Sequence, residues 1–162
     1  MTHHPEFRLV PLADLLPHEE IHGPAVRALA AHLRRVGAVD DPIWVAADSN
    51  VILNGHHRVA ALRALGAERA PAWVIPYDSE LIRLERWDEG PPIERAEVVR
   101  RAAARQLFSP KTTRHILSVE LPRRSTPLAD LFPRGAAPRP PVHHRRTSGR
   151  SRTSGARAPG SG

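Results

Sequence analysis

The sequence predicts an α/β (α+β) fold, in which flanking helices cover a small mixed sheet, followed by a disordered C-terminal tail. Short apolar runs typical of strands alternate with longer segments whose apolar residues recur at helical spacing. Glycines stand where those helical segments end. From residue 134 onward the chain is rich in Arg, Pro, Ser and Gly and has almost nothing apolar to bury. We therefore expect one folded domain at 1–133 and a disordered tail at 134–162.

Phe7 to Leu9 is the first predicted strand. A helix is predicted from Pro24 to Val36, because proline suits the first helical turn and Gly37 supplies a stop. Its apolar residues form one stripe: Val26, Leu29, Ala30 and Leu33.

The next segments predict two strands that pair through a tight turn. Ile43 to Ala46 is followed by Asp48-Ser49-Asn50, which favours a turn, and by the returning strand Val51 to Leu53. A helix from His57 to Leu65 comes next, and Gly66 ends it.

Three further elements complete the predicted domain. Ala72 to Ile75 is a strand, Pro92 to Gln106 is a long helix, and Ile116 to Leu121 alternates like a last strand. Trp44 and Trp73 lie in predicted strands, and both are expected in the core.

Charge and composition exclude several classes of protein. The chain has no cysteine, which excludes disulfides, thiolate metal sites and cysteine catalysis. No apolar run approaches the roughly 18 residues that cross a bilayer, so we expect a cytoplasmic protein. The net charge of +7 belongs to residues 134–162, which hold seven arginines and no acid. The other 133 residues carry 17 basic and 17 acidic side chains, which argues against a dedicated DNA-binding domain.

The segment Asn54-Gly55-His56-His57-Arg58 runs from a buried strand through a glycine turn into a helix. The first turn of a helix leaves backbone N–H groups unpaired and carries partial positive charge, so it favours phosphate. His56 and His57 add donors, and the Arg58 guanidinium matches two phosphate oxygens. These five residues are the predicted phosphate-binding turn.

With the preceding Leu-Leu-Pro-His-Glu-Glu and Asp-Pro-Ile-Trp-Val, this turn resembles the ParB/sulfiredoxin-like superfamily over roughly residues 7 to 77. The free L-serine kinases of that superfamily carry Asp-Gly-His-His-Arg at the turn, and four of the five positions match here. The resemblance implies the ParB/sulfiredoxin-like fold and a kinase that phosphorylates free L-serine, with ATP or ADP as donor and Mg²⁺ as cofactor.

The resemblance also implies a substrate-binding segment. Lys111, Thr112, Thr113, Arg114 and His115 follow Pro110, as in the Pro-Lys-(Ser/Thr)-Thr-Arg-His segment that holds the amino acid in those kinases. Lys111 is also the only lysine in a chain with 23 arginines. The kinases have a tryptophan near the active site, and Trp87 stands at a similar place in this chain.

Glu19 and Glu20 occupy the place from which the related kinases supply the catalytic base. Adjacent side chains of an extended segment point in opposite directions, so one of the two should face the site. We expect Glu19 to be that residue, on the resemblance.

The sequence departs from the kinases at two places. Asn54 replaces the aspartate of their motif, and only 24 positions separate Trp87 from Lys111, where the kinases have a much longer stretch.

Two alternatives to the kinase function remain. One is a ParB-like nucleotide-binding regulator whose basic tail adds weak, nonspecific affinity for nucleic acid. The other is a ligand sensor, in which the pairs His3-His4 and His143-His144 would bind metal or haem.

Overall fold

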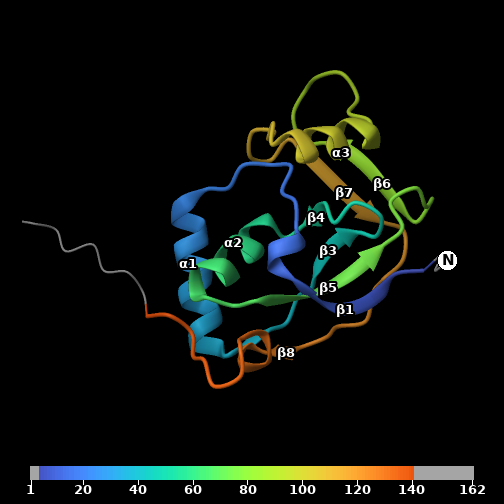
Figure 1. Ribbon diagram of the computed structural model, residues 1–162. Coiled ribbons are helices and arrows are strands. Elements are labelled where there is room, and N and C mark those ends of the chain that lie inside the picture. Colours follow the sequence, from blue (N-terminus) through green and yellow to red (C-terminus); the bar gives the residue numbers. More distant parts are fainter. Residues whose placement is uncertain (1–3, 141–162) are drawn as a thin grey trace, which may run out of the picture.

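In the computed structural model, which describes residues 4–140, a four-stranded sheet lies at the centre (Figure 1). The strands run in the order β1 (Glu6–Pro11), β5 (Arg69–Ile75), β3 (Ile43–Ala46) and β4 (Ile52–Asn54). β3 pairs with β5 in parallel, whereas β1 with β5 and β3 with β4 are antiparallel. The sheet is therefore mixed, as the sequence predicts.

Two helices cover one face of the sheet. α1 (Gly23–Val36) and α2 (His56–Leu65) pack against each other and against the apolar side chains that alternate onto that face, such as Ile43, Val45 and Ala72. Both helices end where the sequence predicts, because Gly37 and Gly66 adopt left-handed backbone at their C-termini.

A smaller layer covers part of the opposite face. The antiparallel pair β6 (Ile82–Arg86) and β7 (Thr113–Leu117) packs there with α3 (Arg95–Ala104), as the upper part of Figure 1 shows. This layer shares a core with the sheet residues that alternate to the second face, including Leu53, Trp73 and Ile75. In this layer His115 of β7 lies near the backbone of Leu53 in β4.

Short elements complete the fold. β2 (Ala38–Val39) pairs with β8 (Thr126–Pro127), and 3-10 turns occupy Leu12–Asp14 and Leu128–Leu131. Within the predicted tail, residues 134–140 are described, and the Arg139 backbone N–H donates to the Leu65 carbonyl at 2.8 Å. The rest of that tail lies outside the described residues.

The prediction of a strand at Ile116–Leu121 is wrong. The strand runs instead from Thr113 to Leu117, because its antiparallel partner β6 begins at Ile82, opposite Leu117. The sequence gives β6 no clear signal, so the register of its partner could not be foreseen. The predicted helix at 92–106 is also shorter, since α3 covers Arg95–Ala104. Within residues 4–140, no helix combines the length and apolarity that a membrane crossing needs.

Candidate active site

The turn between β4 and α2 is built around Gly55. This residue has φ +104°, a backbone conformation that L side chains rarely adopt, and a Cβ added to it would lie 2.6 Å from Ile43 Cγ2. The first backbone hydrogen bond of α2 is donated by the Val59 N–H to the Gly55 carbonyl. The three N–H groups before it, those of residues 56–58, have no intrahelical acceptor and point out of the helix end. Local structure thus creates an anion site at the predicted turn.

Replacing Gly55 with alanine is expected to destabilise the fold more than the same change at Gly37. Both residues have positive φ, but a Cβ at Gly37 meets nothing within 4 Å. Both variants carry a penalty for positive φ, and at Gly55 the added Cβ also meets Ile43 and the Arg58 guanidinium, which should cost about 1–3 kcal/mol more. Urea denaturation of both variants measures this difference. Equal losses of stability would contradict the close packing at Gly55.

The three side chains that open α2 are held in different directions. His56 Nε2 accepts a bond from the His18 backbone N–H at 3.2 Å, and His57 Nε2 accepts one from the His22 N–H at 3.1 Å. Arg58 donates to the Asp41 carbonyl at 2.7 Å and to Asn54 Oδ1 at 3.3 Å. Burial lowers the pKa of Arg58, and the Asp41 carboxylate opposes that shift.

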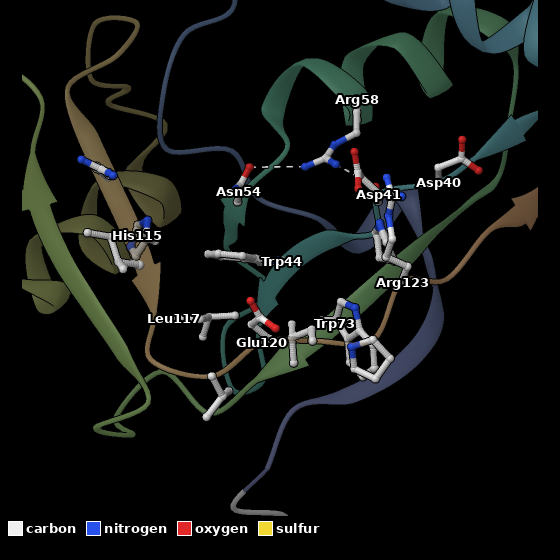
Figure 2. A pocket seen from close by; sticks show the side chains of 16 residues that line it. Asp40, Asp41, Trp44, Asn54, Arg58, Trp73, His115, Leu117, Glu120 and Arg123 are labelled. Carbon is white, nitrogen blue, oxygen red and sulfur yellow. Dashed lines mark hydrogen bonds between the residues drawn. The ribbon is translucent and has the colours of Figure 1, made fainter.

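Among residues 4–140, no carboxylate forms an ion pair with the Arg58 guanidinium. The two oxygens to which it donates, the Asp41 carbonyl and Asn54 Oδ1, are neutral. A half-buried guanidinium without a paired acid favours an anionic ligand. Figure 2 shows this guanidinium beside Asn54 and Asp41 at the upper edge of a pocket.

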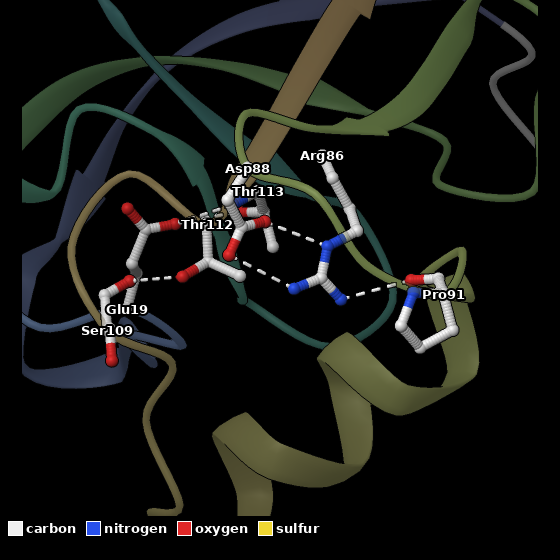
Figure 3. A network of polar contacts seen from close by, with 7 residues as sticks. All are labelled: Glu19, Arg86, Asp88, Pro91, Ser109, Thr112 and Thr113. Atoms are coloured by element: carbon white, nitrogen blue, oxygen red, sulfur yellow. Dashed lines mark hydrogen bonds and ion pairs between the residues drawn. The ribbon is translucent and has the colours of Figure 1, made fainter.

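The Glu19 carboxylate joins the N-terminal segment to the substrate-binding segment. One oxygen accepts the Lys111 backbone N–H, and the other accepts the Thr113 N–H at 3.2 Å and the Thr113 hydroxyl at 2.7 Å (Figure 3). Backbone pairing fixes the carboxylate there, because the Phe108 N–H donates to the His18 carbonyl and the Glu20 N–H donates to the Phe108 carbonyl. Glu20 itself is exposed.

Lys111 has a left-handed backbone with φ +56°. Such a conformation costs a residue with a side chain roughly 1–2 kcal/mol. The bond from its N–H to Glu19 helps to offset that cost. Glu19 therefore also orders the segment that carries Lys111.

A buried cluster of histidines lies behind these groups. His18 is fully buried, and its ring packs edge-on against those of His56 and His115, with centroids 4.6 and 5.6 Å away. His115 Nε2 bonds to the Tyr77 hydroxyl at 2.8 Å. Burial lowers the pKa of His18 to about 4 and that of His115 to about 3, and it lowers the pKa of His56 as well. These rings are neutral at pH 7.

We expect the free energy of unfolding to decrease as the pH falls from about 6.5 to about 4. In the unfolded chain each ring takes up a proton near pH 6.5, whereas His18 and His115 stay neutral in the folded chain down to about 4 and about 3. Acid therefore favours the unfolded state, by up to about 1.4 kcal/mol per pH unit for each histidine. Urea denaturation at pH 7.5 and pH 5 measures this. A His115→Gln variant should show a shallower pH dependence, and an unchanged slope would contradict the shift.

Two residues of each predicted motif line one pocket of about 790 Å³, whereas Glu19, Lys111 and Trp87 are not part of its wall. Asn54 and Arg58 from the turn line it together with Arg114 and His115 from β7 (Figure 2). The remaining wall comes from the β2–β3 loop, the sheet and the segment after β7: Asp40, Asp41, Pro42, Trp44, Trp73, Ile116, Leu117, Val119, Glu120, Leu121, Pro122 and Arg123. The cavity thus extends from the predicted phosphate turn over the second face of the sheet.

The tryptophans differ partly from the expectations. Trp73 is buried in the core as predicted, but Trp44 is only half-buried, and both line the pocket. Trp44 and Trp73 are paired in the parallel register of β3 and β5, which places the two indoles on the same face of the sheet. Trp87 is 58% exposed, with the Arg114 guanidinium 4.5 Å from its ring centroid. The backbone N–H of Trp87 donates to the Thr112 carbonyl, so Trp87 lies beside the predicted substrate-binding segment.

Sequence reasoning assigned no role to His18, Tyr77, Asp41 or Glu120, which surround the predicted residues. His18 stands inside the Pro17-His18-Glu19-Glu20 motif, so the motif itself was the available signal. Between residues 4 and 140, no three His, Cys, Asp or Glu side chains gather as a metal site would need. His3 and the pair His143-His144 lie outside the described residues.

No protein-family model matches the chain. Curated relatives include an ATP-dependent L-serine kinase of Staphylothermus marinus, 39% identical over 88 residues, and another of Desulfurococcus mucosus, 36% identical over 103 residues. These matches span 52% and 61% of this chain but only 35% and 40% of the relatives' own lengths.

Among solved structures, a free serine kinase in complex with AMP aligns with a TM-score of 0.70 at 17% identity, covering 82% of this chain and 95% of that one. The expected fold is therefore confirmed. The chain has the fold of the free serine kinases and a sequence related to the L-serine kinases, which confirms the resemblance predicted from its motifs.

Proposed function

We propose that this protein is a kinase that transfers a phosphoryl group from ATP or ADP to the hydroxyl of free L-serine. The observation that carries the proposal is the meeting of the two motifs at one pocket, where Asn54 and Arg58 face Arg114 and His115. The related L-serine kinases supply the choice of acceptor.

The α2 N-terminus, with Arg58, is suited to hold the nucleotide phosphates, while His56 and His57 tie this turn to the backbone of His18 and His22. Asn54 orients the Arg58 guanidinium through its side-chain oxygen. Because the described residues offer no ready cluster of metal ligands, Mg²⁺ would arrive with the phosphates, as it commonly does in kinases. When bound, Mg²⁺ neutralises phosphate charge, and the protein's part is to position the two substrates.

Glu19 is suited to accept the proton of the serine hydroxyl. The serine oxygen would attack the terminal phosphorus of the donor, the bond to the leaving ADP or AMP would break, and the proton would pass to the carboxylate. A carboxylate oxygen can accept two hydrogen bonds, and Oε1 accepts only the Lys111 N–H within the described part of the chain. Lys111 and Arg114 offer cations for the serine carboxylate and the transferred group, beside Trp87.

The test is to incubate the purified protein with L-serine, Mg²⁺ and either ATP or ADP, and to measure O-phosphoserine. The same assay with L-threonine or without an amino acid controls for other acceptors and for nucleotide hydrolysis. Binding of nucleotide without O-phosphoserine from either donor would contradict the proposed function.

Nucleic-acid binding through the arginine-rich tail stays a prediction, and so does the cytoplasmic location. Removing residues 141–162, which carry five arginines and no acid, is expected to leave the phosphorylation rate within about twofold. Any affinity for nucleic acid should fall and lose its salt dependence, because that affinity rests on arginine–phosphate contacts. The comparison of full and shortened chains in both assays checks this, and loss of phosphorylation on truncation would show that residues 141–162 take part in the reaction.

A further inference from the structure

His18 connects the parts of the candidate site from its centre. Its backbone N–H donates to His56 Nε2, and its carbonyl accepts the Phe108 N–H. Its ring nitrogen Nε2 lies 2.8 Å from the Thr113 hydroxyl oxygen, and both side chains are buried. A single residue therefore contacts the phosphate turn, the segment before Lys111 and β7.

The hydrogen bonds fix where the protons lie. An ionised carboxylate only accepts, so the Thr113 hydroxyl donates its single proton to Glu19 Oε2, at 2.7 Å. The hydroxyl oxygen must then accept from His18, which requires a proton on Nε2 of that ring.

The other ring nitrogen agrees with this assignment. His18 Nδ1 is buried and has no hydrogen-bond partner within the described residues. Burial lowers the pKa of His18 to about 4, although the nearby Glu19 and the Ile52 backbone raise it, so the ring carries one proton at pH 7. An unprotonated Nδ1 leaves one buried acceptor without a partner, which costs roughly 1–3 kcal/mol. A ring protonated on both nitrogens would instead bury an N–H donor and a positive charge, which costs more.

We propose that His18 is a positioning residue for Glu19, acting through a directed chain from His18 Nε2–H to the Thr113 hydroxyl and from that hydroxyl to Glu19 Oε2. This role rests on the proposed kinase function. The chain fixes the side-chain rotamer of Thr113 and leaves Glu19 Oε1 with the Lys111 N–H as its one donor among residues 4–140. Nothing in the family motif alone distinguishes this role from that of an ordinary core histidine.

A double-mutant cycle tests the chain. His18→Leu removes the ring donor at similar size, and Thr113→Val removes the hydroxyl at the same shape. Each change is expected to lower kcat by up to about 100-fold, with the KM for nucleotide unchanged, because a misplaced catalytic group costs about that much. The double variant should be no slower than the slower single variant. Losses that multiply would overturn the proposal.

Two conservative variants separate positioning from simple packing. Thr113→Ser keeps the hydroxyl, and His18→Gln keeps an N–H donor at similar reach, so both should retain kcat within about fivefold. If His18→Gln is as slow as His18→Leu while both melt like the parent protein, the chain does not operate through this donor.

Nitrogen NMR of the imidazole groups tests the same chain without any turnover. In the parent protein at pH 7, the His18 signals should show a proton on Nε2 and none on Nδ1, and Thr113→Val should shift the Nε2 signal. A proton on Nδ1 would overturn the proposal. If no O-phosphoserine forms at all, the kinase function fails, whereas the NMR result still decides whether the hydrogen-bonded chain exists.

Discussion

Replacing Glu19 with glutamine is expected to lower the rate of O-phosphoserine formation about 10²- to 10⁴-fold, while the affinity for nucleotide stays the same. General-base catalysis contributes a factor of that size, and an amide cannot accept the proton of the serine hydroxyl. Glutamine matches glutamate in size and keeps a side-chain oxygen that can accept the Lys111 N–H. The variant therefore removes the base and preserves much of the ordering of residues 111–113.

A second substitution at the same position separates the two roles of the carboxylate. Alanine removes the base and also the acceptor for the Lys111 and Thr113 N–H groups, so the Ala variant should be less stable than the Gln variant by about 1–3 kcal/mol. Glu97→Gln, on the surface of α3, serves as the matched control. Rates come from O-phosphoserine measurements under saturating serine, and affinities from nucleotide titration.

Two results would contradict the assignment. A Gln variant that turns over at the parent rate would show that Glu19 only orders the neighbouring segment. A loss of turnover on substitution of the exposed Glu20, with Glu19 variants unaffected, would place the base on the other residue of the pair.

The sequence predicts the sheet and the first two helices because their signals are local. The stripe of α1, the glycines that end α1 and α2, and the Asp-Ser-Asn turn between β3 and β4 each lie within one short segment. Gly55 belongs to the same group, because a glycine between a strand and a helix already indicates a special backbone.

Strands that form only by pairing with segments distant in the sequence could not be predicted in the same way. β6 has a mixed, half-buried pattern, and only its pairing with β7 makes it a strand. The correct strand at 113–117 contains polar residues that no alternation rule would select. Thr113 is buried because Glu19 and His18, about 95 positions earlier, provide its hydrogen-bond partners.

The candidate site also combines residues that a local motif predicts with residues that only the fold brings there. Its motif residues follow from the resemblance, but the pocket needs residues from the β2–β3 loop and the segment after β7 that have no motif. The half-exposure of Trp44 likewise depends on its place in the wall of that pocket. Neither feature is encoded in a spacing along the chain.

Replacing Arg58 with alanine is expected to weaken nucleotide binding about 10- to 100-fold. Its guanidinium has no described carboxylate partner and donates only to neutral oxygens, so its charge is available to a phosphate. A hydrogen bond to a charged group is worth roughly 1.5–3 kcal/mol, which corresponds to that range of affinity. Isothermal titration with ATP and ADP measures the change.

Two matched variants show which property of Arg58 matters. Arg58→Lys keeps the charge but loses the planar fork, so it should recover only part of the lost affinity. Arg63→Ala removes an arginine from the same helix whose guanidinium donates to the carbonyls of Leu12 and Leu15, so it should lower stability and leave nucleotide affinity unchanged. If Arg58→Ala binds ATP and ADP like the parent protein, the end of α2 is not the phosphate site. The lost bonds to Asp41 and Asn54 would then be the only consequence, visible as a lower melting temperature.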